Sequence, residues 1–159
     1  MNSDQSNDQL LKALLNRVEA LEREAPKDQL TLGVISGDLE RTMFAFMVAL
    51  GATVFDMEVE MFFALRATAA LRAPAKIKKN LADLEPSAIK FDLKKHGAMS
   101  LEDLIRQAGE AGVRITVCNL SLDLMEISRE ELIDYPHLTF AGVASLIEMS
   151  SQSKQCLFI

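Results

Sequence analysis

One stretch of the chain, residues 112–125, limits the possible folds more than any other. A β-branched run from Val113 to Cys118 follows a glycine and ends on a cysteine, and a short helical pattern starts near Leu122. In an open α/β sheet this order places a thiol at the carboxyl end of a strand, where such folds bind ligands. A helix start beside the thiol favours the thiolate, because helix N-termini carry partial positive charge.

The rest of the chain repeats this alternation of apolar runs and helical patterns. The first run, Leu30–Ile35, is apolar on both faces, which is typical of a buried parallel strand. Further strands are predicted at 57–65, 113–118 and 155–159, and helices at 39–50, 101–111, 129–135 and 142–153, with a short one from about Leu122. The order predicts an α/β fold, an open parallel sheet with helices on both faces.

Capping residues set the expected helix ends. Asp38 and Ser100 stand where N-caps are needed, and Ser128 begins a capping box with Glu131. Gly51 and Gly112 are expected to end the helices that precede them.

Residues 1–28 form a unit distinct from the α/β domain expected over 29–159. Ser6 and Gln9 fit a capping box, the apolar residues Leu11, Leu14, Val18 and Leu21 follow 3-4-3 spacing, and Pro26 stops the helix. This amphipathic helix either docks on its own domain or serves oligomerisation through a short coiled coil; two heptads do not decide between these. Inside the domain, the connection 66–98 is unusually long, which indicates a functional segment or an interface.

Composition narrows the function classes. The formal net charge is −6, which argues against nucleic acid as a partner. The apolar region 42–71 is interrupted by charged residues, so we expect a buried helix and strand there and no membrane span. The N-terminus shows no secretory pattern, and the two cysteines make no disulfide framework, so we expect a cytoplasmic protein with reduced thiols.

Several of these segments resemble the DsrE/DsrF/DsrH-like family, small sulfur-transfer proteins that include TusD. The resemblance is carried by 112–127, the tail segments 131–133, 140–144 and 156–159, and the front segments 34–38, 49–52 and 57–63. It covers about 125 residues, is weakest over 66–98, and is greatest to DsrE-type members. The leading helix lies outside it.

The resemblance implies a flavodoxin-like sheet and assembly into trimers or hexamers. It implies that Cys118 accepts sulfane sulfur and carries it as a persulfide or a thiosulfonate. Donor and acceptor proteins of the rhodanese-like and TusA-like kinds are the implied partners. The expected function is therefore that of an intracellular sulfur carrier or sulfurtransferase. The alternative is a non-catalytic assembly or regulatory module in which Cys118 is a packed, structural thiol.

Other polar residues are placed to line a pocket near Cys118. Ser36, Gly37 and Asp38 follow the first strand and are expected at the same sheet edge, either lining the pocket or forming a plain helix cap; the cap is favoured. Further pocket candidates are Asn119, Ser121 and His96, the last as a group that promotes ionisation of the thiol.

No cofactor or metal is expected. The glycines after the first strand do not form a dinucleotide fingerprint, and there is no phosphate-binding P-loop. His96 and His137 lack metal-ligand spacing with the cysteines. The second thiol, Cys156, is predicted to lie inside the last strand and to pack there. One reactive cysteine without a resolving partner favours a carrier over a dithiol oxidoreductase.

Overall fold

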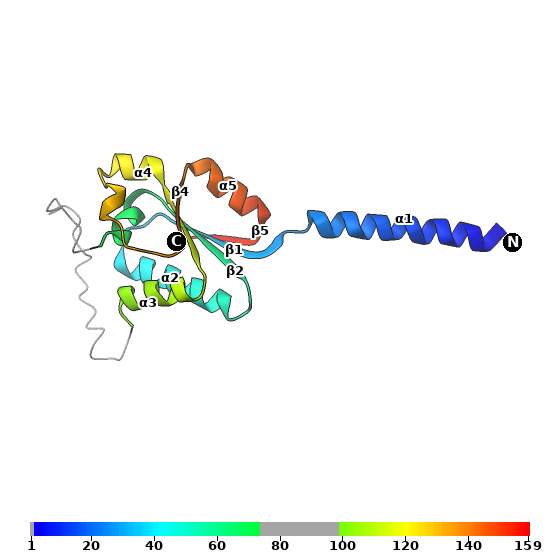
Figure 1. Ribbon diagram of the computed structural model, residues 1–159, viewed down its shortest axis with the longest axis horizontal. Coiled ribbons are helices and arrows are strands. Elements are labelled where there is room, and N and C mark those ends of the chain that lie inside the picture. The colour runs from blue at the N-terminus through cyan, green and yellow to red at the C-terminus, as the bar shows by residue number, and fades with distance from the viewer. Residues whose placement is uncertain (1, 74–98) are drawn as a thin grey trace.

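The computed structural model describes residues 2–73 and 99–159, with side chains from residue 7 onward. Its centre is a five-stranded sheet in which all neighbours are parallel, in the order β4-β3-β2-β1-β5 (Figure 1). The strands are β1 (Lys27–Val34), β2 (Glu58–Phe63), β3 (Arg114–Cys118), β4 (Leu138–Ala141) and β5 (Ser153–Phe158). The parallel sheet predicted from the alternating pattern is confirmed.

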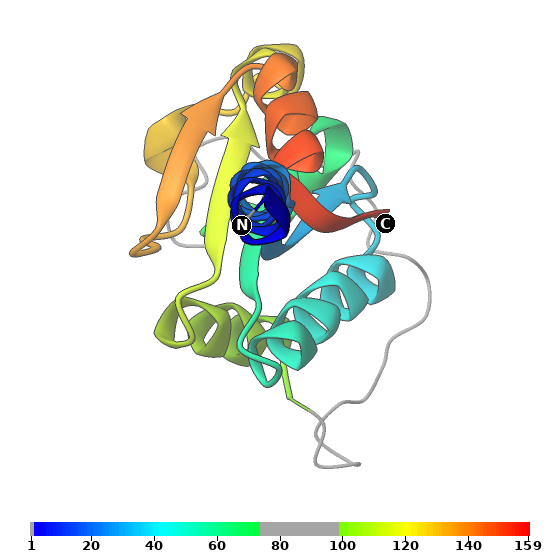
Figure 2. The same cartoon turned by 90° about the vertical axis from the view of Figure 1, so that its right-hand side faces the viewer.

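Helices cover both faces of this sheet, as expected. One face is covered by α2 (Leu39–Thr53) and α3 (Leu101–Glu110), and the other by α4 (Asn119–Leu124) and α5 (Val143–Gln152) (Figures 1 and 2). Two 3₁₀ segments, η1 (Leu65–Leu71) and η4 (Arg129–Glu131), follow β2 and α4. The arrangement is a flavodoxin-like α/β fold.

The main core lies between the sheet and the α2–α3 layer. Alternate residues of the three central strands point into it and are fully buried, among them Leu32, Met61 and Ile115. Phe46 of α2 packs on them, with its ring 5.9 Å from that of Phe63. The predicted buried helix and strand over 42–71 are thus confirmed as α2 and β2.

Two of the predicted helix starts are capped as expected. The Asp38 carboxylate accepts a hydrogen bond from Arg41 N at 3.1 Å. Ser100 and Asp103 form a reciprocal capping box, and the hydrogen bonds from Ser100 lower the pKa of the Asp103 carboxyl. Gly112 follows α3 with φ +80°, a left-handed conformation that glycine adopts without strain.

The expected stop at Gly51 is wrong. Helix α2 runs through this glycine to Thr53, where Thr53 Oγ1 donates to Leu50 O at 2.8 Å. The left-handed residue comes later, at Asp56 with φ 58°. Gly51 therefore costs the helix some stability but does not end it.

The helix predicted from the Ser128 capping box is also wrong. Only the short η4 forms. Glu131 Oε1 accepts from Ser128 Oγ at 3.3 Å, while its Oε2 turns inward and accepts a hydrogen bond from Arg72 Nε at 3.0 Å. Both side chains are buried, and the hydrogen bonds from Arg72 lower the pKa of Glu131. This ion pair joins η1 to η4, while the four-residue edge strand β4, which the pattern did not predict, occupies 138–141.

Helix α1 (Asn2–Glu24) projects away from the sheet and its layers (Figure 1). It begins at Asn2, so Ser6 lies within the helix and the predicted N-cap there is wrong; it ends before Pro26 as expected. In the described part of the chain, no helix combines the length and the apolar character that a membrane crossing needs.

Candidate functional site

Cys118 is the last residue of β3, at the carboxyl edge of the sheet, and occupies the N-cap position of α4. Its thiol is free and its side chain is only 3% exposed. It packs in a small apolar cluster with Phe62 of β2 and Leu146 of α5, against which Ala64 and Met149 lie. The predicted strand-end position is confirmed, but the thiol is enclosed rather than open to solvent.

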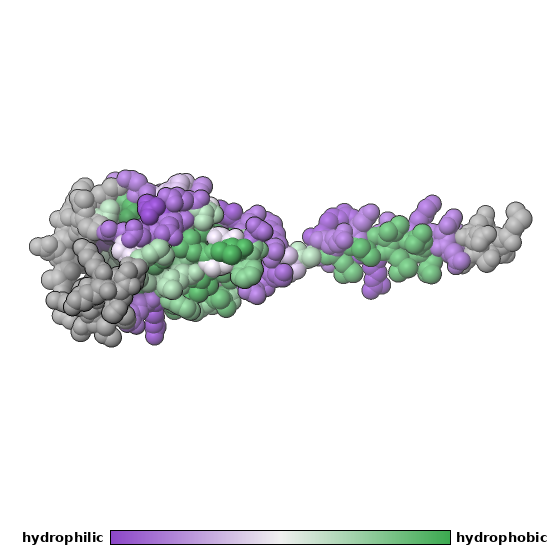
Figure 3. All heavy atoms as spheres, turned by 90° about the horizontal axis from the view of Figure 1, so that it is seen from below, coloured by the Kyte–Doolittle hydropathy of each residue, from purple (hydrophilic) through white to green (hydrophobic). Residues whose placement is uncertain are grey.

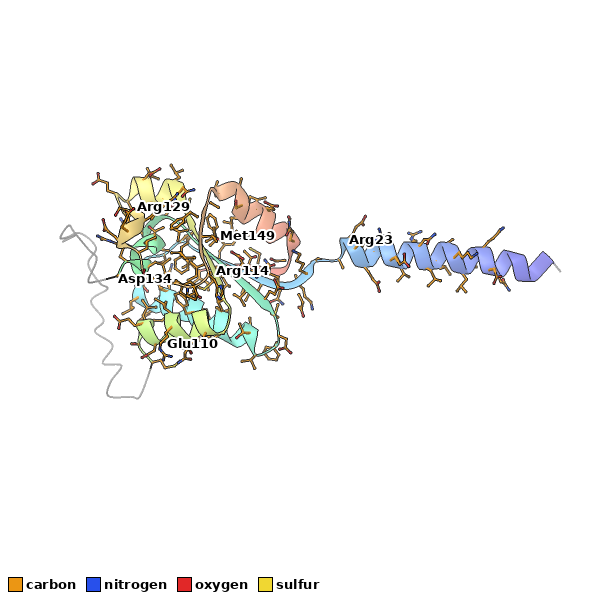
Figure 4. All side chains as sticks on the ribbon, viewed as in Figure 1. Arg23, Glu110, Arg114, Arg129, Asp134 and Met149 are labelled. Atoms are coloured by element: carbon orange, nitrogen blue, oxygen red, sulfur yellow. The ribbon has the colours of Figure 1, made fainter. Side chains whose placement is uncertain are left out.

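The strand register explains which helix covers the thiol. Val117 of β3 belongs to the main core, so its neighbour Cys118 points to the opposite face, toward α5. Ala141 of β4 pairs with Cys118, and α5 begins two residues later. Figure 4 shows Met149 on the side of α5 that faces the sheet. The cover of Cys118 is therefore built mainly by α5.

The expected contact between the thiol and a helix N-terminus takes a different form. Helix α4 starts at Asn119, directly after the cysteine, and has only six residues. Within this described segment, the Cys118 side chain accepts no capping hydrogen bond. The thiol instead lies in the cluster with Phe62 and Leu146.

A cation that sequence reasoning missed lies beside the residue after Cys118. Arg129 of η4 donates from Nη2 to Asn119 Oδ1 at 2.8 Å, and its guanidinium lies 4.3 Å from the centre of the Phe140 ring (Figure 4). The half-buried Asn119 is thus oriented from outside the strand. No sequence signal marked Arg129, because its spacing suggested only a helix start.

The predicted pocket residues after β1 form hydrogen bonds to the backbone of the turn and of α2. Ser36 Oγ accepts from Asp38 N at 3.2 Å, and Asp38 caps α2, on the sheet face opposite Cys118. A Cβ at Gly37 would lie 2.7 Å from the Arg66 carbonyl oxygen, so the turn after β1 approaches η1 closely there. Because β2 lies between β1 and β3, the Ser36–Asp38 turn and Cys118 are not neighbours in the strand order.

Of the other predicted pocket residues, Ser121 makes a structural contact and His96 lies in the part of the chain that is not described. Ser121 is buried, and its Oγ accepts from Leu65 N at 2.7 Å, which fixes α4 to the left-handed turn after β2. His96 lies outside the described residues, as does most of the 66–98 connection.

A polar pocket of about 280 Å³ lies under α5, next to the thiol cluster. Cys118 is not among its lining residues, but two residues beside the cysteine, Ala141 and Met149, are. Its floor holds Glu60, which accepts from Arg114 Nε at 2.6 Å and from Thr116 Oγ1 at 2.8 Å. Thr116 and Cys118 share one sheet face, so a displaced Met149 would connect the pocket with the thiol.

Cys156 is remote from Cys118. It lies in β5, paired with Thr31 of β1, so two strands stand between the cysteines. Three strand spacings amount to about 14 Å, twice the Cα separation that a disulfide tolerates. Across residues 2–73 and 99–159, no group of three or more His, Cys, Asp or Glu side chains is arranged to hold a metal ion.

Comparison with known proteins places this fold in a family. Uncharacterized protein YrkE of Bacillus subtilis (strain 168) is 30% identical over 154 residues, which span 81% of this chain and 95% of YrkE. Sulfur carrier protein DsrE2 of Allochromatium vinosum is 32% identical over 71 residues, 45% of this chain and 43% of that protein.

The structural comparison agrees at the level of fold. The crystal structure of the ychN protein from E. coli has a TM-score of 0.56 and covers 82% of this chain and 98% of its own, at 10% identity. The sequence model of the DsrE/DsrF/DrsH-like family matches residues 67–158, which include Cys118 and its cover. On the family match and the YrkE similarity, the chain belongs to the DsrE/DsrF/DrsH-like family.

Proposed function

We propose that the protein relays sulfur through Cys118, taking it from a donor thiol and passing it to an acceptor thiol. The observation that carries the proposal is a free cysteine at the carboxyl end of β3, within the region that matches the family. A named sulfur carrier, DsrE2, is among the relatives. The strand-end position is where open α/β sheets hold their reactive groups.

The transfer requires no net oxidation or reduction. The Cys118 thiolate attacks the outer sulfur of a donor persulfide, an S–S bond forms to Cys118, and the donor thiolate leaves. In the second step an acceptor thiolate attacks the outer sulfur on Cys118, which leaves as a thiolate. A thiosulfonate group would be carried on the same sulfur atom. Rhodanese-like donors, TusA-like acceptors, a cytoplasmic location and a trimeric or hexameric assembly belong to this proposal.

The burial of the thiol makes opening of the α5 cover a part of the mechanism. Leu146 and Met149 close over Cys118, and in the described residues Leu146 is the one α5 side chain that is buried. A helix held by so little apolar contact detaches at a small free-energy cost compared with a core helix. We infer that donor and acceptor thiols reach Cys118 when α5 moves, and that the closed state protects the load from water and stray thiols.

The test is sulfur loading followed by intact-mass measurement. Protein incubated with polysulfide should gain about 32 Da for one sulfur. Protein incubated with tetrathionate should gain about 112 Da for a sulfur with an SO₃ group, because the Cys118 thiolate attacks an inner S–S bond and thiosulfate leaves. Cys118→Ser should abolish the gain and keep the far-UV circular dichroism spectrum, whereas the matched control Cys156→Ser should load normally. Loading that persists in Cys118→Ser would refute the proposed role.

A second function is favoured by one specific observation, the 3% exposure of the thiol. A cysteine so enclosed suits a structural role in an assembly or regulatory module. Iodoacetamide kinetics at neutral pH separate the two functions. If α5 opens, Cys118 reacts far faster than the rate of global unfolding allows; if Cys118 reacts only as the protein unfolds, the module is supported.

A further inference from the structure

Helix α1 carries an apolar stripe that nothing in the described chain covers. Six residues along it are between 49% and 62% exposed: Leu10, Leu11, Leu14, Leu15, Val18 and Leu21. Figure 3 shows an apolar strip along the visible side of α1, with hydrophilic groups beside it. So large a contiguous apolar surface marks an interaction site.

The domain to which α1 is joined does not provide the cover. Only Ala25 and Pro26 separate the end of α1 from β1 at Lys27, and the helix leads away from the sheet (Figures 1 and 2). A single helix of this length is marginal in water unless its apolar face is packed. We therefore expect a second molecule to cover the stripe.

We propose that the stripe is covered by α1 of a second copy of this chain, as a parallel, in-register coiled coil. Leu11 and Val18 occupy heptad a positions and Leu14 and Leu21 d positions. Val18 at a, with leucine at both d positions, follows the pattern of parallel pairs, whereas Leu11 at the other a position is not β-branched. Leu10 and Leu15, at g and e, widen the seam at the N-terminal end.

The charges beside the seam distinguish parallel from antiparallel pairing. In a parallel pair, a g residue faces the e residue five positions later in the other helix, so Arg17 faces Glu22 of the second copy. An antiparallel pair that keeps the same four a and d residues in contact places Arg17 opposite its own counterpart. Opposite charges meet in the first arrangement and like charges in the second, which favours the parallel one.

The consequence is that two copies of the α/β domain leave the coiled coil at the same end. Each α1 continues almost directly into its β1, so the domains lie close to one another at the C-terminal end of the helices. Pairing of this kind agrees with the proposed hexamer, as three pairs, and not with an isolated trimer. It does not depend on sulfur chemistry at Cys118.

Cysteine cross-linking in the full chain tests the pairing and its direction. In a background with Cys118→Ser and Cys156→Ser, Leu14→Cys places a thiol at a d position, where parallel in-register helices bring the two copies into disulfide range. Asn16→Cys, on the outer f position of the same helix turn, is the matched control. Mild oxidation should produce a covalent dimer from the Leu14 variant on the order of tenfold faster or more than from the control.

Several outcomes of the cross-linking would contradict the parallel pair. In the antiparallel pair residue 14 lies opposite residue 18, so Leu14→Cys would not cross-link, and the proposal would be overturned. Equal cross-linking at positions 14 and 16 would also overturn it, because it would report random collision. No cross-link at either position would overturn the proposal as well, because it would show that the stripe is not paired in register with a second copy.

Charge reversal provides an independent check on register. Glu22→Arg or Arg17→Glu alone should weaken self-association of the full chain on the order of two- to fivefold, and the combined Arg17→Glu and Glu22→Arg variant should restore it. Analytical ultracentrifugation over a concentration series measures these dissociation constants. A double variant as weak as the single ones would contradict the Arg17–Glu22 contact between copies.

Discussion

The two faces of the sheet carry different kinds of side chain. Toward α2 and α3, the central strands present only apolar side chains, such as Leu32, Met61 and Val117, all fully buried. Toward α5, the same strands present polar residues at their beginnings, including Glu60 and Thr116, and apolar ones only at their carboxyl ends. The first face is a continuous core, and the second is half a polar pocket and half a small cluster around Cys118.

Because of this difference, one face provides most of the folding stability and the other controls access to Cys118. Apolar burial is the main favourable term in folding, so the α2–α3 face contributes most of the free energy that holds the domain together. The α5 face contributes less, so the opening of α5 proposed above would leave the rest of the domain folded. If the Cys118 thiol pointed to the first face, it would be buried in the main core. Because it points to the second face, it is covered by α5, a helix with little apolar contact.

The largest expected effect is on the α2–α3 face. Phe46→Ala removes a fully buried ring that packs on Phe63 and should lower the free energy of unfolding by about 3–5 kcal/mol. Phe44→Ala, on the same helix but 56% exposed, should change it by less than about 0.5 kcal/mol. Urea denaturation followed by circular dichroism measures both. Similar losses from the two variants would mean that α2 is not packed as described.

The sequence predicts this stable face well because its signals are local and mutually consistent. The runs ending at Val34 and Cys118 are apolar and short, and Asp38 and Ser100 both cap the helices that follow them. One error arose beside a tertiary contact. Glu131 contacts Ser128 as a capping box predicts, but it also pairs with buried Arg72, 59 residues earlier, a partner that no spacing rule indicates. The four-residue β4 is too short for its alternation to be read.

The site was predicted less completely than the fold. Strand position identified Cys118, yet which sheet face the thiol would point to depended on the register of β3 against its neighbours. Whether Ser36–Asp38 would reach it depended on strand order, because β2 lies between β1 and β3. Arg129 comes to Asn119 through the path of η4, a non-local feature. Long-range geometry of this kind leaves no pattern within a single segment.

A smaller effect is expected where α5 closes over the thiol. Leu146 is 7% exposed, and Leu146→Ala should cost about 2 kcal/mol, mostly in the closing of α5 rather than in the main core. Alkylation of Cys118 by iodoacetamide, in a Cys156→Ser background, should then accelerate on the order of tenfold, which corresponds to about 1.4 kcal/mol of weakened closure. The control is Ile147→Ala, one residue along α5 and 68% exposed. An unchanged alkylation rate in Leu146→Ala would show that α5 does not control access.

The smallest effect is expected in the polar half of the α5 face. Glu60 accepts hydrogen bonds from Arg114 and Thr116, and Glu60→Gln keeps the side-chain volume but removes the charge that both donors approach. Because Arg114 is partly exposed and can turn toward water, the loss should be about 1 kcal/mol rather than the several expected for a fully buried pair. Glu58→Gln, which changes a largely exposed partner of the same arginine, should be nearly neutral. If Glu60→Gln instead costs as much as Phe46→Ala, the polar contacts between β2 and β3 stabilise the domain as much as the main core does, and the two faces do not differ as described.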